Sequence, residues 1–377
     1  MSKEIYIEEI EKFVSEFKEK ESISVINLSD WNPSSEFMNK LAINIPYTFA
    51  INPISYIFSS DFDQTIKSKI INKWKYKNEK AIIFFNSGSE SILNVLYLLF
   101  RQNCKKIYLV CPTYFSIEPI CQTLHIDCKK IYLERINNIY YLPSNFENDI
   151  ENNSCLWITN PIYCTGNLYS KNDIDKIKNC VIAKELFLVN DESLCFQDFA
   201  LTYAFESYEN YINIITPHKA LCTNALKFSG IILPNKYYDA MDRWSDVLEG
   251  CLGAGALVAI NHFLSPQFSI YEQSFRDNIE KNRLVILSLI HKYKVDFDMF
   301  SKSYLLSLYF DNIAYDYLDN LQQMKNLIYD TNAYIITGSK NNFSPYHGLS
   351  FRINLCRVDT AYLYALERVL IYLKYKN

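Results

Sequence analysis

The chain has 377 residues and a net charge of −4, with 49% hydrophobic and 15% aromatic residues. This composition excludes a mostly disordered chain, and the charge supplies no basic field that would attract nucleic acid or acidic lipid. Glycine is scarce, since eight glycines are about a third of the usual ~7%. We therefore expect each remaining glycine to lie where a side chain would be costly.

The first predicted element is an amphipathic helix, because Ile7, Ile10, Val14 and Phe17 share one helical stripe. This stretch has no apolar core of signal-peptide length, and no window has the ~18 apolar residues of a membrane span. None of the eleven cysteines forms a CxxC pair, and the five histidines are scattered along the chain. We expect a cytoplasmic protein with buried free thiols, and neither a metal site nor a membrane segment.

Short β-branched and aromatic runs then alternate with amphipathic helical stretches such as Glu90–Phe100 and Ser170–Cys180. This alternation predicts an α/β protein, with a mostly parallel sheet between two helical layers. The expected strands are Ala81–Phe85, Ile107–Val110, Leu156–Thr159, Leu186–Asn190, Ile214–Thr216 and Phe228–Leu233.

The pattern changes after about residue 265, where a long polar helix, Ile270–Lys292, is expected. We predict a three-layer α/β/α large domain over residues 45–265 and a smaller α+β domain from residues 1–44 and 266–377. The remaining elements expected in the small domain are the strands Tyr304–Phe310, Tyr334–Thr337 and Ser350–Leu355 and the helix Thr360–Lys376.

Polar residues follow the predicted strands at the positions where ligands bind in doubly wound sheets. Each run taken alone is also typical of ordinary caps and turns, but five in this order indicate a site. The runs are Asn-Ser-Gly-Ser-Glu-Ser at 86–91, Cys-Pro-Thr-Tyr-Phe at 111–115, Thr-Asn-Pro-Ile-Tyr-Cys-Thr-Gly at 159–166, Asn-Asp-Glu-Ser at 190–193 and Thr-Pro-His-Lys at 216–219.

With these runs the chain resembles the fold-type I pyridoxal-phosphate enzymes, specifically the class I and II aminotransferases, from about Asn27 to the C-terminus. The resemblance makes Lys219 the Schiff-base lysine and Asp191 the partner of the pyridine nitrogen. Tyr114 matches the aromatic residue that stacks on the cofactor ring, although a core tyrosine is the alternative in a chain with 30 tyrosines.

The resemblance also implies a phosphate site. The helix expected to begin at Ser87–Glu90 favours an anion at its N-terminus. At position 227 a lysine replaces the arginine that the family usually has, which keeps the positive charge. Tyr56 aligns with a tyrosine that reaches the phosphate of the partner subunit, which implies a homodimer with shared active sites. The remaining implied cofactor contacts are Ser87, Gly88, Ser89, Glu90, Asn160, Tyr163, Thr216 and Lys227.

Substrate binding is expected to depend on Arg352, which matches the arginine that binds the substrate α-carboxylate. It is expected on an alternating, half-buried strand, and a structural salt bridge is the alternative role. Trp31 and Asn32 are expected in the side-chain pocket. Trp31 favours an apolar or aromatic substrate side chain, although the aromatic composition of the chain explains it equally well.

Besides Lys227, the chain departs from the family at three positions. Tyr163 replaces an asparagine and Leu194 replaces a tyrosine, and both of the usual residues donate to the phenolic oxygen of the cofactor. These departures have two interpretations. Either the sequence has drifted and the Tyr163 hydroxyl replaces the lost donors, or the protein catalyses a specialised reaction. The third is His218, since a His-Lys pair resembles the decarboxylase and desulfurase branches of the same fold.

The function implied is that of a pyridoxal-phosphate-dependent aminotransferase, which moves an amino group between an amino acid and a keto acid or carbonyl acceptor. The alternative within the fold is a decarboxylase, a lyase or a cyclase. A non-catalytic relative is a third possibility, which the presence of both Lys219 and Asp191 disfavours. No DNA-binding module or basic stripe is present to suggest a nucleic-acid partner.

Overall fold

The computed structural model describes residues 3–41, 56–77 and 79–375. Its main element is a seven-stranded sheet with the order β2-β10-β9-β8-β7-β3-β4, in which only β10 runs antiparallel to its neighbours. The strands are β2 (Ala81–Phe85), β3 (Lys106–Cys111), β4 (Asp127–Tyr132), β7 (Cys155–Thr159), β8 (Phe187–Glu192), β9 (Tyr211–Ile215) and β10 (Ser229–Leu233).

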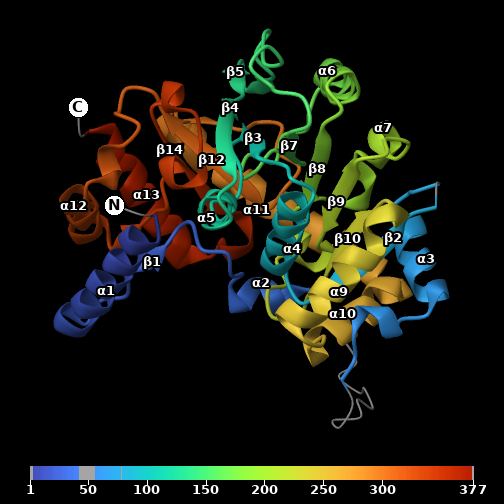
Figure 1. Cartoon of the computed structure of the whole chain (residues 1–377). Helices are drawn as coiled ribbons and strands as arrows, with labels where there is room; N and C mark the ends of the chain where they lie inside the picture. Colours follow the sequence, from blue (N-terminus) through green and yellow to red (C-terminus); the bar gives the residue numbers. More distant parts are fainter. Residues whose placement is uncertain (1–2, 42–55, 78, 376–377) are drawn as a thin grey trace.

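Helices cover both faces of this sheet (Figure 1). Both faces of the sheet are apolar, as β2 illustrates: Ile82 and Phe84 pack into one apolar cluster, and Ile83 and Phe85 pack into another. A strand buried on both faces has to be apolar throughout, which is the pattern that the sequence shows. The helices of this part are α3 (Gln64–Lys73), α4 (Gly88–Arg101), α5 (Ile117–Thr123), α6 (Lys171–Ala183), α7 (Thr202–Phe205), α8 (Pro217–Ala220), α9 (Tyr238–Glu249) and α10 (Ala254–Leu264).

Three smaller sheets complete the fold. An antiparallel sheet has the order β11-β12-β14, β1 pairs with β13 in parallel, and β5 and β6 form a hairpin. The strands are β1 (Ile26–Asn27), β5 (Glu134–Ile136), β6 (Ile139–Tyr141), β11 (Asp296–Phe297), β12 (Leu305–Phe310), β13 (Ala333–Tyr334) and β14 (Leu349–Asn354).

The terminal parts of the chain come together around this antiparallel sheet. In Figure 1, α1, α12 and α13 lie on the opposite side of the molecule from α3, and α12 contacts both α1 and α13. The β1–β13 pair also joins the N-terminal segment to the C-terminal part. The helices are α1 (Lys3–Glu21), α2 (Ser35–Lys40), α11 (Pro266–Tyr293), α12 (Leu321–Thr331) and α13 (Thr360–Lys374).

The predicted α/β class with a mostly parallel sheet is confirmed, and so are the six predicted strands of that sheet, apart from their ends. The largest difference among them is in β9, which begins at Tyr211, three residues before the predicted Ile214, and ends before Thr216. The division into domains at residues 45 and 265 stays a prediction, and its first boundary lies outside the described residues. No helix among the described residues is long and apolar enough to cross a membrane.

Candidate active site

A cavity of about 270 Å³ lies at the carboxyl ends of the parallel strands. Thr159 and Asp191 belong to β7 and β8, and Thr216 follows β9 directly. Such strand ends position ligands in open α/β sheets, because the helices that follow them leave a crevice there. The cavity is lined by Trp31, Asn32, Ser87, Gly88, Ser89, Ile92, Tyr114, Thr159, Tyr163, Asp191, Ser193, Leu194, Thr216, Lys219, Asn224 and Lys227.

Lys219 lies on the single turn α8, which begins at Pro217 after the cap residue Thr216. Its Nζ donates a hydrogen bond to Asn224 Oδ1 at 2.9 Å. Burial lowers the pKa of Lys219 to about 8; Cys222 opposes this shift, and the cations Lys227 and Arg352 add to it. More of this amine than of an ordinary lysine is therefore neutral near neutral pH, which is the state in which an amine acts as a nucleophile.

Asp191 is a buried carboxylate that faces the cavity, and its side chain is 3% exposed. Its Oδ1 accepts a hydrogen bond from Ser193 N at 3.0 Å. Burial raises the pKa of Asp191, while hydrogen bonds from Ser193 oppose the shift. Asp191 forms no ion pair within the part of the chain that the structure describes. A buried carboxylate without a cation is costly, and a cationic ligand group would offset that cost.

A pocket suited to an anion forms where β2 leads into α4. Ser87 caps this helix by accepting a hydrogen bond from Glu90 N at 3.3 Å. Gly88 leaves room beside Thr216, since a Cβ built on Gly88 would lie 3.3 Å from Thr216 Oγ1. The side chain of Lys227 lines the same cavity. Backbone N–H groups at a helix start, hydroxyls and an ammonium together suit a phosphate.

Arg352 lies on β14, which is buried along its whole length rather than half-buried as the sequence predicts. Its side chain is 2% exposed, with hydrogen bonds to Ser29 O at 3.2 and 3.3 Å and to Asn341 Oδ1 at 3.0 Å. No carboxylate among the described residues forms an ion pair with it. The described residues therefore do not support the alternative role of Arg352 in a structural salt bridge. A buried guanidinium without an anion is costly, and a bound carboxylate would offset that cost.

Three aromatic side chains from separate parts of the chain form one wall of the cavity. The ring centroids of Trp31 and Tyr163 lie 6.3 Å apart, and those of Tyr163 and Tyr114 lie 5.9 Å apart. The Trp31 ring contacts both cations, with Lys219 Nζ at 4.4 Å and Arg352 Cζ at 4.0 Å from its centroid. The Tyr163 hydroxyl lies 3.5 Å from Arg352 Nη1.

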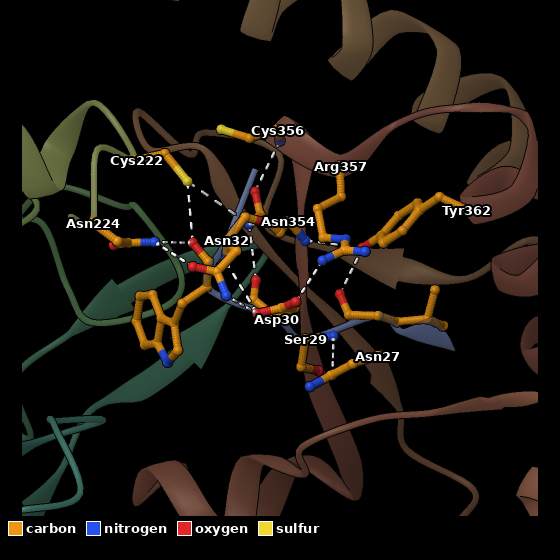
Figure 2. A network of polar contacts seen from close by, with 12 residues as sticks. Asn27, Ser29, Asp30, Asn32, Cys222, Asn224, Asn354, Cys356, Arg357 and Tyr362 are labelled. Carbon is orange, nitrogen blue, oxygen red and sulfur yellow. Dashed lines mark hydrogen bonds and ion pairs between the residues drawn. The ribbon is translucent and has the colours of Figure 1, made fainter. Parts of the chain in front are cut away.

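The position of Trp31 is fixed through the backbone of residues 28–32, which we call the strap (Figure 2). Each carbonyl of the strap accepts a hydrogen bond from a side chain that is distant in sequence, so few of its backbone groups are free to rearrange. The donors are Tyr362 to Leu28 O, Arg352 to Ser29 O, Asn354 to Asp30 O, Asn224 and Cys222 to Trp31 O, and Asn354 to Asn32 O. Arg357 also forms an ion pair with Asp30.

The structure does not bring every predicted site residue to the cavity. The Asn160 amide donates to Glu192 Oε1 at 3.1 Å and to Phe199 O at 2.8 Å, so this residue supports a buried network behind the site. The Glu90 carboxylate accepts from Asn86 N at 2.7 Å. Tyr56 is 75% exposed and lies away from the cavity lining.

His218 also points away from the cavity, toward His262. Its Nε2 lies 3.1 Å from His262 Nδ1, and burial lowers the pKa of His218 to about 3, with a smaller contribution from His262. A neutral histidine buried in this way is typical of packing, so the His-Lys pair does not contribute a second titrating group to the cavity.

The sequence did not single out Ser193, Asn224, Ile92 or Thr159, which all line the cavity. Ser193 and Thr159 belong to polar runs that were recognised at strand ends, so their positions in these runs could have identified them as cavity residues. Asn224 lies five residues after Lys219 and directly after Thr223, and nothing in this local sequence indicates a site residue.

A family model described as aminotransferase class I and II matches residues 50–368. The chain belongs to this family. A histidinol-phosphate aminotransferase from Buchnera aphidicola is 28% identical over 194 residues, which are 49% of this chain and 53% of that protein. The match therefore spans about half the length of this curated relative.

Solved structures of family members have the same fold at low identity. An aspartate aminotransferase from Thermotoga maritima superposes with a TM-score of 0.77 at 13% identity, covering 99% of this chain and 97% of its own. The Escherichia coli protein YbdL, with a methionine aminotransferase function, has a TM-score of 0.75 at 15% identity and 96% coverage of both chains. At this identity the likeness establishes the fold alone.

Proposed function

We propose that this family member is a pyridoxal-phosphate-dependent aminotransferase that acts on amino acids with a free α-carboxylate. One observation carries the proposal: a single cavity combines the buried amine of Lys219, the unpaired carboxylate of Asp191 and the anion pocket at Gly88 and Lys227. These three features fit the aldehyde, the ring nitrogen and the phosphate of the cofactor, respectively.

The residues have separate roles in this proposal. Bound pyridoxal phosphate supplies an aldehyde and an electron-withdrawing ring. Asp191 keeps the ring nitrogen protonated, because its carboxylate has no other cation, and the helix start at Ser87 and Gly88 holds the phosphate. Tyr114 supplies an aromatic face in the same cavity, and Tyr163 provides the hydroxyl that replaces the usual donors to the phenolic oxygen.

Arg352 and Lys219 act on the substrate. Arg352 binds the α-carboxylate through its planar fork, which orients the Cα–H bond. Lys219 removes the proton from Cα of the amino donor and, in the second half-reaction, gives a proton to Cα of the keto-acid acceptor, a general acid–base role that suits a pKa of about 8. The Trp31 ring and Leu194 give the rest of the pocket an apolar character, which favours an apolar or aromatic side chain.

The test is to supply the purified protein with cofactor, a set of amino acids and a keto acid, and to follow all products by mass spectrometry. An aminotransferase forms a new amino acid and a new keto acid in equal amounts. The Lys219→Ala variant should lose this activity, whereas Lys236→Ala, at an exposed lysine, should keep it. Release of carbon dioxide or ammonia without amino transfer would favour the decarboxylase or lyase alternative.

We also propose a homodimer whose sites are shared through Tyr56. Support comes from the resemblance and from the exposure of this tyrosine, which leaves it available to a second subunit. A mixture of Lys219→Ala and Tyr56→Ala chains tests this, because a hybrid dimer would contain one site with both residues intact. Activity above that of either variant supports sharing, and no gain after subunit exchange would contradict it.

We further propose that the protein works in the reducing cytoplasm. All eleven cysteines are free thiols, and all except Cys128 and Cys251 are buried. Titration of the denatured protein, purified without reductant, should give eleven thiols, and a disulfide-linked peptide would contradict the proposal.

A further inference from the structure

The side-chain amide of Asn224 connects Lys219 to the strap. Its Oδ1 accepts the hydrogen bond from Lys219 Nζ at 2.9 Å, and its Nδ2 donates to Trp31 O at 2.8 Å and to Asn32 Oδ1 at 3.1 Å. A backbone carbonyl can only accept a hydrogen bond, so Trp31 O fixes which end of the amide faces the strap. The oxygen end is therefore directed at the lysine.

We propose that Asn224 is a positioning residue, which holds the amine of Lys219 whenever that amine is not covalently engaged. The inference rests on the proposed role of Lys219 as the reactive amine. Asn224 acts through Lys219 and is not itself placed in contact with the substrate.

Asn224 is well placed for this role because Lys219 has few other partners. Among the described residues, Asn224 Oδ1 is the one hydrogen-bond acceptor found for Lys219 Nζ. The other groups that act on the amine are the Trp31 ring, the thiol of Cys222 and the cations Lys227 and Arg352. Asp191 lines the same cavity but forms no ion pair with the lysine.

The Asn224 amide should have a measurable effect on the pKa of Lys219, because the neighbouring cations disfavour the charged form of the amine. Burial, Lys227 and Arg352 all disfavour the ammonium form, whereas an oxygen acceptor favours it. Removal of the acceptor should therefore lower the pKa of Lys219, and a carboxylate in the same place should raise it. If Asn224 had only a packing role, removal of its oxygen would leave the pKa of Lys219 unchanged, so the downward shift is the discriminating result.

The strap gives Asn224 a second connection, to the substrate pocket. Trp31 and Asn32, which orient the amide, line the cavity themselves, and the strap is anchored to Arg352 through Ser29 O. Contacts therefore run without a break from the amine of Lys219 through Asn224 and the strap to Arg352. Figure 2 shows the middle of this chain, where Asn224 meets the strap.

The experiment measures the pKa of Lys219 in the full chain without added cofactor. The rate at which trinitrobenzenesulfonate modifies this lysine is followed across pH by mass spectrometry of its peptide. The wild type should titrate near 8. Asn224→Leu should titrate about one unit lower and Asn224→Asp about one unit higher, as expected when an ammonium loses or gains a charge-assisted hydrogen bond.

A matched control is Ala225→Ser, at the exposed neighbouring position, which should titrate as the wild type does. In the transamination assay, Asn224→Leu should lower kcat by about tenfold and change KM little, since misplacement of a reacting group affects the chemical step.

The proposal is overturned if Asn224→Asp and Asn224→Leu keep a native circular dichroism spectrum and titrate as the wild type does. If Asn224→Leu does not fold, Asn224→Ala removes the same acceptor and should give the same downward shift. The reagent reacts with the amine whether or not the protein transfers amino groups. The expected shifts without transamination would therefore support the role of Asn224 in holding the amine and contradict the proposed function.

Discussion

The guanidinium of Arg352 stacks on the indole of Trp31, with its Cζ 4.0 Å from the ring centroid. The ring supports a buried cation without neutralising it, because a cation–π contact is weaker than an ion pair with a carboxylate in a dry site. With Ser29 O and Asn341 Oδ1 as its main hydrogen-bond acceptors, Arg352 is held in place and still lacks an anion. The stacking thus prepares the site for a carboxylate.

The first prediction is that Arg352→Gln raises KM for the amino-acid donor by roughly 10- to 100-fold, because hydrogen bonds to a charged group are lost. Arg352→Lys should lie between this variant and the wild type, since an ammonium keeps the charge but not the planar fork. Steady-state kinetics provide the measurement. An amine substrate without a carboxylate should have a similarly low kcat/KM with all three proteins. If the variants lose as much kcat/KM with this amine as with the amino acid, Arg352 does not bind the carboxylate.

The second prediction concerns the phosphate. Lys227→Met should weaken the binding of pyridoxal phosphate by about tenfold, whereas Lys227→Arg should retain or strengthen it because the fork is bidentate. Titration by absorbance gives the dissociation constants. Pyridoxal without the phosphate should bind the three proteins alike, so that an equal loss for both ligands would show that Lys227 acts elsewhere.

The sequence predicted those parts of the fold that depend on continuous apolar runs. The strand Ala81–Phe85 was predicted with its observed bounds, because it is buried on both faces and bounded by turn residues. The edge strand β4 was not predicted, since Asp-Cys-Lys-Lys-Ile-Tyr combines charges with only partial burial. Edge strands commonly carry such charges, so a search for apolar runs does not detect these strands.

The candidate site was predictable where it follows a strand end and not where it depends on distant contacts. Lys219 and Asp191 were predicted from the family resemblance, which rests on the order of the strand-end runs along the chain. The contact of Asn224 with Trp31 O joins residues 193 positions apart, and local spacing cannot indicate such a pair. Asn160 belongs to a recognisable motif, yet its amide is directed at a buried carboxylate, which only the packing behind β8 reveals.

That carboxylate is the subject of the third prediction. Glu192 is fully buried and accepts hydrogen bonds at both oxygens. Its donors are Trp74 Nε1 at 2.6 Å, Leu201 N at 2.7 Å, Asn190 Nδ2 at 2.9 Å, Asn213 Nδ2 at 2.9 Å and Asn160 Nδ2 at 3.1 Å.

Glu192→Gln should lower the free energy of unfolding by about 3 kcal/mol or more, because the new amide places a donor against existing donors. Chemical denaturation provides the measurement. Glu209→Gln, at a glutamate whose side chain is 89% exposed, should change the stability by less than about 0.5 kcal/mol. If the two variants are equally stable, the network around Glu192 does not support the sheet.

The fourth prediction concerns a buried cluster where the hairpin β5–β6 meets β12. Asp298 accepts hydrogen bonds from Tyr309 at 2.9 Å and from Tyr140 at 3.1 Å, and Arg135 Nε lies 3.4 Å away. Burial raises the pKa of Asp298 to about 7, although Arg135 opposes the shift. The folded protein therefore retains a proton here at pH values where the unfolded chain has lost it.

The sign of the pH dependence follows from this difference. Between the usual aspartate pKa of 3.8 and about 7, the folded state binds more protons than the unfolded state, so this group makes stability fall as pH rises through that window. Asp298→Asn cannot titrate, and its stability should depend less on pH from about 4 to 7 than that of the wild type. Denaturation series at several pH values measure both dependences, and parallel curves would show that Asp298 is already ionised across this range.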